Sequence, residues 1–167
     1  MENKFFDIAP ICEYGRSPVQ VEAMEEYELF ENFDENSSII KNNSVRAIKG
    51  KKWNDVIPFE SSHHFLISEN LKKTLEENKV TGINFFPVKI KLKPKKKYFG
   101  FYLTHTAGPL LNKKEASWGL APKQFDESTW DGSDIFNLEG TLVTIITERV
   151  KKILEKGKFT NLEIEPI

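Results

Sequence analysis

The same pattern of hydrophobic and polar residues occurs twice along this chain. Residues 67–88 and 146–167 align over 22 positions without a gap, at an offset of 79, and nine of the aligned pairs are identical. In each copy a short apolar run, Phe65–Ile67 or Leu142–Ile146, leads into a segment with apolar residues at four-residue spacing, and an alternating apolar run follows. These periods predict a strand, a helix and a second strand in each copy.

The residues at the helix ends support this prediction. Ser68 and Thr147 stand where a hydroxyl can cap the first turn of a helix. The helices are predicted to end at Asn78 and Gly157, because these residue types best tolerate a left-handed conformation. The helix residues expected to pack in the core are Leu71, Leu75, Val150 and Leu154.

Turn and strand signals describe the rest of the chain. Val88–Leu92 and Tyr98–Leu103 flank a turn rich in Pro and Lys and predict a hairpin. Thr106–Ser133, rich in Gly, Pro, Ser and Lys, predicts a long surface connection. Ser17-Pro18 is a good helix start, whereas Tyr27–Leu29 also suits a strand, so both alternatives stay open in the N-terminal third.

Chain length sets the fold class that these elements can build. A chain of 167 residues falls in the range of one domain, and two copies are too few for a solenoid. We therefore predict a single α+β domain over residues 1–167, in which the two repeated strand–helix–strand units pack on a shared mixed β-sheet.

Cysteine content and hydropathy indicate the compartment. Cys12 is the only cysteine, so an intramolecular disulfide is impossible and nothing points to an oxidising compartment. The N-terminal segment lacks the basic and apolar regions of a secretory signal, and the longest strongly apolar run is too short to span a bilayer. We expect a cytoplasmic protein with no membrane partner.

Charge is unevenly distributed along the chain. Residues 1–36 hold ten acidic and two basic residues, and residues 37–167 hold fifteen acidic and twenty-two basic ones. The acidic part has interleaved aromatic residues and is either a solvated helix face or a surface that docks a basic protein. The candidate partner-binding residues are Glu22, Glu25, Glu26, Tyr27, Glu28, Phe30 and Glu31.

A lysine cluster offers a different surface. Its members are Lys89, Lys91, Lys93, Lys95, Lys96 and Lys97. Such a patch could contact phosphates, but lysines also protect an edge strand against aggregation. Only three of the 24 basic residues are Arg, the residue that usually dominates base recognition, so nucleic acid is the less favoured partner.

Candidate catalytic and metal-binding residues lack a supporting pattern. His63 and His64 are adjacent and would point to opposite faces of a strand, and no metal-ligand spacing is present. An acid–base site could be assembled only on paper, from His105, Asp134, Glu139 and Glu148. Because no nucleophile elbow, phosphate loop or dinucleotide fingerprint occurs, we expect no enzymatic activity, no cofactor and no metal.

Several segments occur in an order that resembles a known family. They are Trp53-x-Asp55, Leu66-Ile67-Ser68-Glu69-x-Leu71, Thr81–Val88, Ala116-Ser117, Asp134-Ile135-Phe136, Ile146–Val150 and Leu162–Ile167. This order is similar to the eleventh immunity-protein family of bacterial polymorphic toxin systems, formerly a domain of unknown function. The resemblance covers residues 53–167 and leaves residues 1–52 unmatched.

The resemblance implies a protein that binds a cognate toxin and blocks it, and it implies no catalytic residues. Two other classes of function stay open. One is a nucleic-acid-binding protein that uses the Lys89–Lys97 hairpin, which should lose affinity steeply with salt. The other is an enzyme without a recognisable motif, which should show a concave pocket holding His105 or carboxylates with perturbed pKa values.

Overall fold

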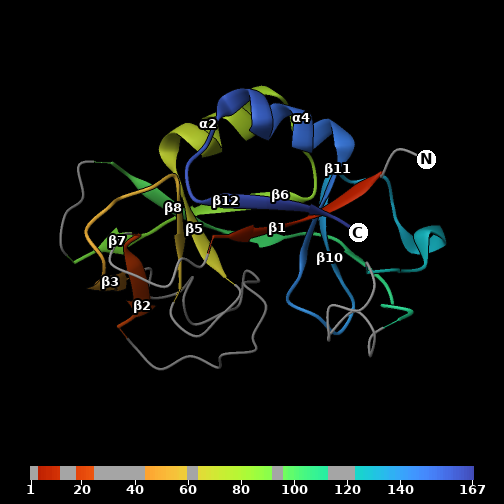
Figure 1. Cartoon of the computed structure of the whole chain (residues 1–167), viewed down its shortest axis with the longest axis horizontal. Coiled ribbons are helices and arrows are strands. Elements are labelled where there is room, and N and C mark those ends of the chain that lie inside the picture. Colours follow the sequence, from red (N-terminus) through yellow and green to blue (C-terminus); the bar gives the residue numbers. More distant parts are fainter. Residues whose placement is uncertain (1–3, 12–17, 25–43, 60–63, 92–95, 113–122) are drawn as a thin grey trace.

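The computed structural model describes residues 4–11, 18–24, 44–59, 64–91, 96–112 and 123–167. Within them the chain is α+β, with two α-helices, one 3₁₀ helix and twelve strands in three sheets (Figure 1). The helices are α2 (Glu69–Glu77), α4 (Glu148–Gly157) and the 3₁₀ helix η1 (Glu127–Thr129). The strands are β1 (Phe5–Pro10), β2 (Gln20–Ala23), β3 (Ser44–Lys49), β4 (Val56–Pro58), β5 (Phe65–Ser68), β6 (Ile83–Pro87), β7 (Lys89–Ile90), β8 (Tyr98–Leu103), β9 (Thr106–Ala107), β10 (Ile135–Leu138), β11 (Thr144–Thr147) and β12 (Leu162–Pro166).

The first large sheet has four antiparallel strands in the order β4-β5-β8-β6. Strand β5 is buried at every residue, which its uninterrupted apolar run requires, and it leads directly into α2. The Ser68 hydroxyl accepts a hydrogen bond from the Leu71 amide at 3.2 Å and so caps the helix as predicted. Helix α2 then buries Leu71 and Leu75 against this sheet.

The second large sheet has the order β12-β1-β11-β10-β9, with β9 parallel to β10 and the other pairs antiparallel. Helix α4 follows β11 and buries Val150 and Leu154 over β1 and β11. Thr147 occupies the N-cap position but its hydroxyl makes no capping bond, because it faces Asp134 at 3.5 Å instead. The predicted capping role of this hydroxyl is therefore wrong.

The third sheet, β2-β3-β7, differs from the sequence expectations (Figure 1, left). Residues Gln20–Ala23 form a strand, so no helix starts at Ser17-Pro18 and runs through them. The expected hairpin is also wrong in its pairing: β8 pairs with β6, whereas Lys89–Ile90 leaves that sheet to run parallel to β3. One shared mixed sheet was expected, and the strands are divided among three.

The two large sheets have matching strand orders and registers. The order β4-β5-β8-β6 corresponds to β10-β11-β1-β12, with β1 in the position that β8 holds in the first sheet. The matched pairs are Val56–Ile67 with Ile135–Ile146, and Ile67–Phe99 with Ile146–Phe6. Strand β1 thus fills the same strand position in the second sheet that β8 fills in the first. Strand β1 precedes the other strands of its sheet in the sequence, whereas β8 follows those of its own.

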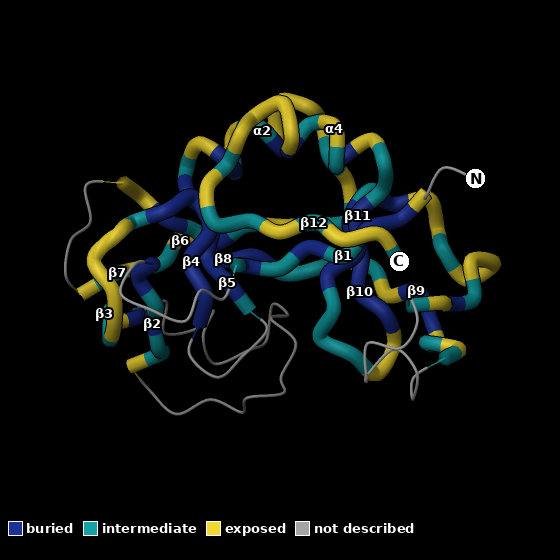
Figure 2. Tube along the Cα trace, in the orientation of Figure 1, coloured by how far each residue is buried: buried dark blue, intermediate teal, exposed yellow. Residues whose placement is uncertain are grey.

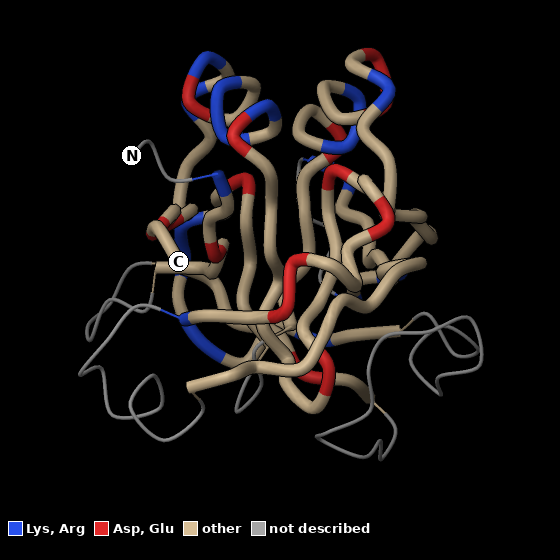
Figure 3. Tube along the Cα trace, turned by 90° about the vertical axis from the view of Figure 1, so that its right-hand side faces the viewer, with Lys and Arg blue, Asp and Glu red and all other residues tan. Residues whose placement is uncertain are grey.

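Both helices and both large sheets share one core. Helices α2 and α4 lie side by side on the same side of the molecule (Figures 1 and 2). Their buried residues belong to one hydrophobic cluster, together with Phe6, Val56, Phe65, Phe101 and Ile146. Two backbone bonds also connect the sheets, from the Val56 amide to the Thr160 carbonyl and from the Ile135 amide to the Thr81 carbonyl. The exposed faces of the helices carry interleaved basic and acidic residues (Figure 3).

The helix ends show which residues turn the chain. Asn78 and Gly157 stand at the helix ends as predicted, but neither is left-handed there. The left-handed residues are Lys79 and Lys158, with φ of 51° and 50°. Each stands one residue beyond the position predicted from residue type.

Candidate functional site

The predicted acidic contact segment lies mostly outside the described residues. Glu25, Glu26, Tyr27, Glu28, Phe30 and Glu31 all fall in that part of the chain. Glu22 is described: it lies on β2, and its carboxylate pairs with the Arg46 guanidinium on the neighbouring strand β3.

The described lysines of the predicted hairpin differ in their surroundings. Lys89 and Lys91 are exposed, while Lys93 and Lys95 fall outside the described residues. Lys96 and Lys97 lie near acidic side chains: the Lys96 ammonium is 3.5 Å from Asp55, and the Lys97 ammonium is 3.7 Å from Glu69.

His105 and Glu148 each pair with a residue outside the candidate acid–base set. His63 lies outside the described residues. The partner of His105 is Asp131 and not Asp134: the Nδ1 atom of His105 is 3.0 Å from an Asp131 carboxylate oxygen. Nε2 of His105 is buried and has no hydrogen-bond partner in the described part of the chain. Glu148 pairs with Lys152 at 3.2 Å. No group of three or more His, Cys, Asp or Glu residues is placed to hold a metal ion within the described ranges.

Asp131 has a shifted pKa with a local cause. Partial burial raises the pKa of this carboxyl, but the Ser133 amide, 2.8 Å away, and the neighbouring His105 lower it below its usual value. At neutral pH the carboxylate is therefore ionised, and it faces Nδ1 of His105.

Asp55 is saturated by hydrogen-bond donors. Its carboxylate accepts from the Ser68 hydroxyl at 2.8 Å, the Thr160 hydroxyl at 2.9 Å and the Thr160 amide at 3.1 Å. Burial raises the pKa of Asp55, but these hydrogen bonds and the Lys96 charge outweigh it, so the pKa lies below the ordinary 3.8. Burial, and secondly the Asp55 charge, raise the pKa of Tyr98 to about 12. Its hydroxyl donates to the Asn54 carbonyl at 2.7 Å.

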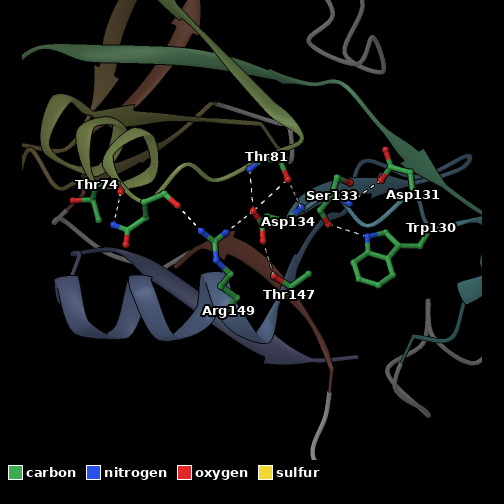
Figure 4. Close-up of polar contacts among 9 residues, drawn as sticks. Thr74, Thr81, Trp130, Asp131, Ser133, Asp134, Thr147 and Arg149 are labelled. Carbon is green, nitrogen blue, oxygen red and sulfur yellow. Dashed lines mark hydrogen bonds and ion pairs between the residues drawn. The ribbon is translucent and has the colours of Figure 1, made fainter.

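Asp134 is the matching carboxylate in the other sheet (Figure 4). It accepts from the Thr81 amide at 3.0 Å and the Thr81 hydroxyl at 3.2 Å, and it pairs with the Arg149 guanidinium. Arg149 also donates to the Asn78 carbonyl at the end of α2. One carboxylate thus ties the start of β10 to the loop before β6 and to helix α4.

The two carboxylates form a reciprocal pair of cross-links. Asp55 stands before β4 and binds Thr160 before β12, whereas Asp134 stands before β10 and binds Thr81 before β6. The offset of 79 residues relates all four, and Asp55 and Asp134 carry it beyond the ungapped match of residues 67–88 with 146–167. With these hydrogen bonds in place, the two carboxylates hold the sheets together and are poorly placed for acid–base work.

An exposed groove lies beside β6 and the turn after α2. Its walls include Lys72, Glu76 and Lys79 from α2 and the turn after it, and Phe85 and Tyr102 from β6 and β8. In the core, a small apolar cavity of about 20 Å³ lies between the sheets. It has room for about one water molecule and no polar lining, so it is a packing gap and not a ligand site.

Comparison with known proteins adds no family assignment. No protein-family model matches the chain, and no curated protein is significantly similar to it. Among the described residues, no helix is long and apolar enough to cross a membrane.

Proposed function

We propose that this protein is a cytoplasmic immunity protein that binds a cognate bacterial toxin and neutralises it by protein–protein contact, without catalysis. The observation that carries the proposal is the groove at the β6 edge, where half-buried aromatic side chains and the exposed Lys79 stand beside the free edge of the strand. Aromatic anchors and a free strand edge are recurrent features of protein-docking surfaces. The resemblance over residues 53–167 indicates that the partner is a toxin.

The internal arrangement supports a binding role for the same surface. We propose that residues 55–88 and 134–167 are two copies of one strand–helix–strand unit, each extended by the strand that precedes it. Their carboxylates Asp55 and Asp134 are engaged in cross-links, which leaves the exposed edges and helix faces for contacts with a partner. A rigid scaffold of this kind keeps an interface preorganised and lowers the entropy cost of binding.

Co-expression tests the proposal. If the reading frame upstream of this gene encodes a large protein with a variable C-terminal domain, that domain is the toxin candidate, to be expressed alone and together with this chain. We expect the domain to arrest growth, and we expect this chain to restore growth and to co-purify with the domain. Growth arrest that this chain leaves unchanged would refute the proposal. A steeply salt-dependent affinity for oligonucleotides, with no affinity for the domain, would favour nucleic-acid binding instead.

The acidic segment stays a predicted contact within this function. Reversing Glu25, Glu26 and Glu28 to Lys is expected to slow association with a basic toxin and to leave the fold intact, because opposite charges steer the encounter. Association rates at two salt concentrations measure this effect. An unchanged rate at both would remove the segment from the interface.

A further inference from the structure

Strand β6 has one free edge. It is the outermost strand of its sheet and pairs with β8 from Ile83 through Pro87. Among the described residues, no backbone hydrogen bond reaches its other edge. Such an edge presents a row of unpaired amide and carbonyl groups, which is a template for one more strand.

The groove lies along this edge and uses both faces of the strand. Ile83 and Phe85 point toward the core under α2, where the Lys72 ammonium stands 5.5 Å from the centre of the Phe85 ring. Asn84 points to the opposite face and donates to the Tyr102 hydroxyl at 3.2 Å. Because alternate side chains of a strand point to opposite faces, a groove lined by both sets follows the backbone edge itself.

Lysines outnumber acidic residues around β6: the groove is lined by Lys72 and Lys79 and by one acidic residue, Glu76. Residues 78–91 contain three lysines and no acidic residue. Lys79 stands before β6, and Lys89 and Lys91 follow it; all three are exposed, and none has an ion pair among the described residues.

The corresponding strand in the other large sheet has a different charge from β6. Strand β12 is also an edge strand, and it carries the exposed residues Glu163 and Glu165. Phe159 packs its ring against Gly157 there, at the position that the smaller Val80 takes beside β6. Glu163 and Glu165 stand at the positions that the uncharged Asn84 and Phe86 hold in β6, so the two edge strands differ in charge.

We propose that the β6 edge binds an acidic, extended segment of a partner protein as an additional strand. Backbone hydrogen bonds to the edge supply affinity that does not depend on sequence. Lys79, Lys89 and Lys91 select an acidic segment, and Phe85 and Tyr102 contact its apolar side chains. The inference deepens the proposed function, since it names the surface of the immunity protein and the chemistry of the toxin segment that this surface would hold.

A peptide titration tests the inference without the toxin. The probe is a synthetic, end-capped peptide of alternating Glu and Val, added to the full ¹⁵N-labelled chain and followed by NMR. We expect shifts and slowed hydrogen exchange at alternate amides of β6, with an affinity that falls as salt rises. The same peptide with Lys in place of Glu should not bind.

Matched variants separate the edge from general electrostatics. The double variant Lys79→Glu, Lys89→Glu should weaken peptide binding at least tenfold. The control Glu163→Lys, Glu165→Lys adds positive charge at β12 and should leave the shifts at β6 in place. Circular dichroism and thermal melting of each variant establish that the fold is kept.

Two results would overturn the inference. One is an absence of chemical-shift changes along β6 when the Glu–Val peptide is added. The other is a loss of selectivity: either the Lys–Val peptide binds as tightly as the Glu–Val peptide, or the Lys79→Glu, Lys89→Glu variant binds the Glu–Val peptide as tightly as the wild type does. If the chain neutralises the toxin but fails the peptide test, the proposed function stands and this surface is wrong. If the peptide binds but the toxin does not, the surface stands and the proposed function falls.

Discussion

Asp55→Asn tests whether a buried carboxylate holds the two large sheets together. The substitution keeps the shape of the side chain and removes its charge. The Asp55 side chain is 12% exposed and accepts three hydrogen bonds, two of them from Thr160 across the junction between the sheets. The single oxygen of the amide can keep the Thr160 bonds or the Ser68 bond, but not both sets.

The size of the effect follows from these bonds. A hydrogen bond to a charged group contributes about 1.5–3 kcal/mol, and a bond between neutral groups contributes about 1 kcal/mol. In Asp55→Asn the remaining hydrogen bonds join neutral groups, and one bond loses its favourable geometry. Together these changes are expected to lower the free energy of unfolding by about 2 kcal/mol. For a chain of this size the melting temperature should fall by roughly 4–8 °C.

The pH dependence of the loss identifies its cause. The pKa of Asp55 is lower in the folded chain than its ordinary 3.8, so its contribution to stability is fully present above about pH 4 and is lost as the pH falls through the folded pKa. Urea unfolding of wild type and variant should therefore differ by about 2 kcal/mol at pH 7 and converge below pH 3.8. Glu163→Gln, at an exposed carboxylate, is the matched control and should have no effect. A difference below about 0.5 kcal/mol at pH 7, or one that persists unchanged at pH 3, would refute the cross-link.

Two further predictions concern packing. Leu75→Ala and Leu154→Ala should each lower the free energy of unfolding by about 2–5 kcal/mol in urea titrations, since both side chains are 4% exposed and lie in the shared cluster; a loss under about 1 kcal/mol would place them outside the core. Gly82→Ala should be far more destabilising than Gly140→Ala in thermal melts. Both glycines have positive φ, but of the two only Gly82 approaches another backbone atom closely: an added methyl group would lie 1.9 Å from the Ile135 carbonyl oxygen. Equal falls in melting temperature for the two variants would contradict this close approach.

Local chemistry alone determined the two helices and the strands that flank them. The four-residue apolar spacing placed Leu71, Leu75, Val150 and Leu154 in the core, where the structure has them. Ser68 caps α2 because its hydroxyl lies within reach of an amide in the first turn, a relation between residues three apart in the chain. Such short-range signals are complete in the sequence and need no knowledge of the fold.

Tertiary structure decided how these elements pair. The alternation of apolar and polar residues predicts which face of a strand is buried, but it does not predict which strand lies beside it. The sequence pattern therefore does not indicate that β1 takes, in the second large sheet, the position that β8 holds in the first. The split of β6 from β7 and the roles of Asp55 and Asp134 depend on partners 45 to 105 residues away. The free edge of β6 likewise depends on the tertiary structure, because it results from the position of β6 at the end of the strand order and not from any residue in the strand.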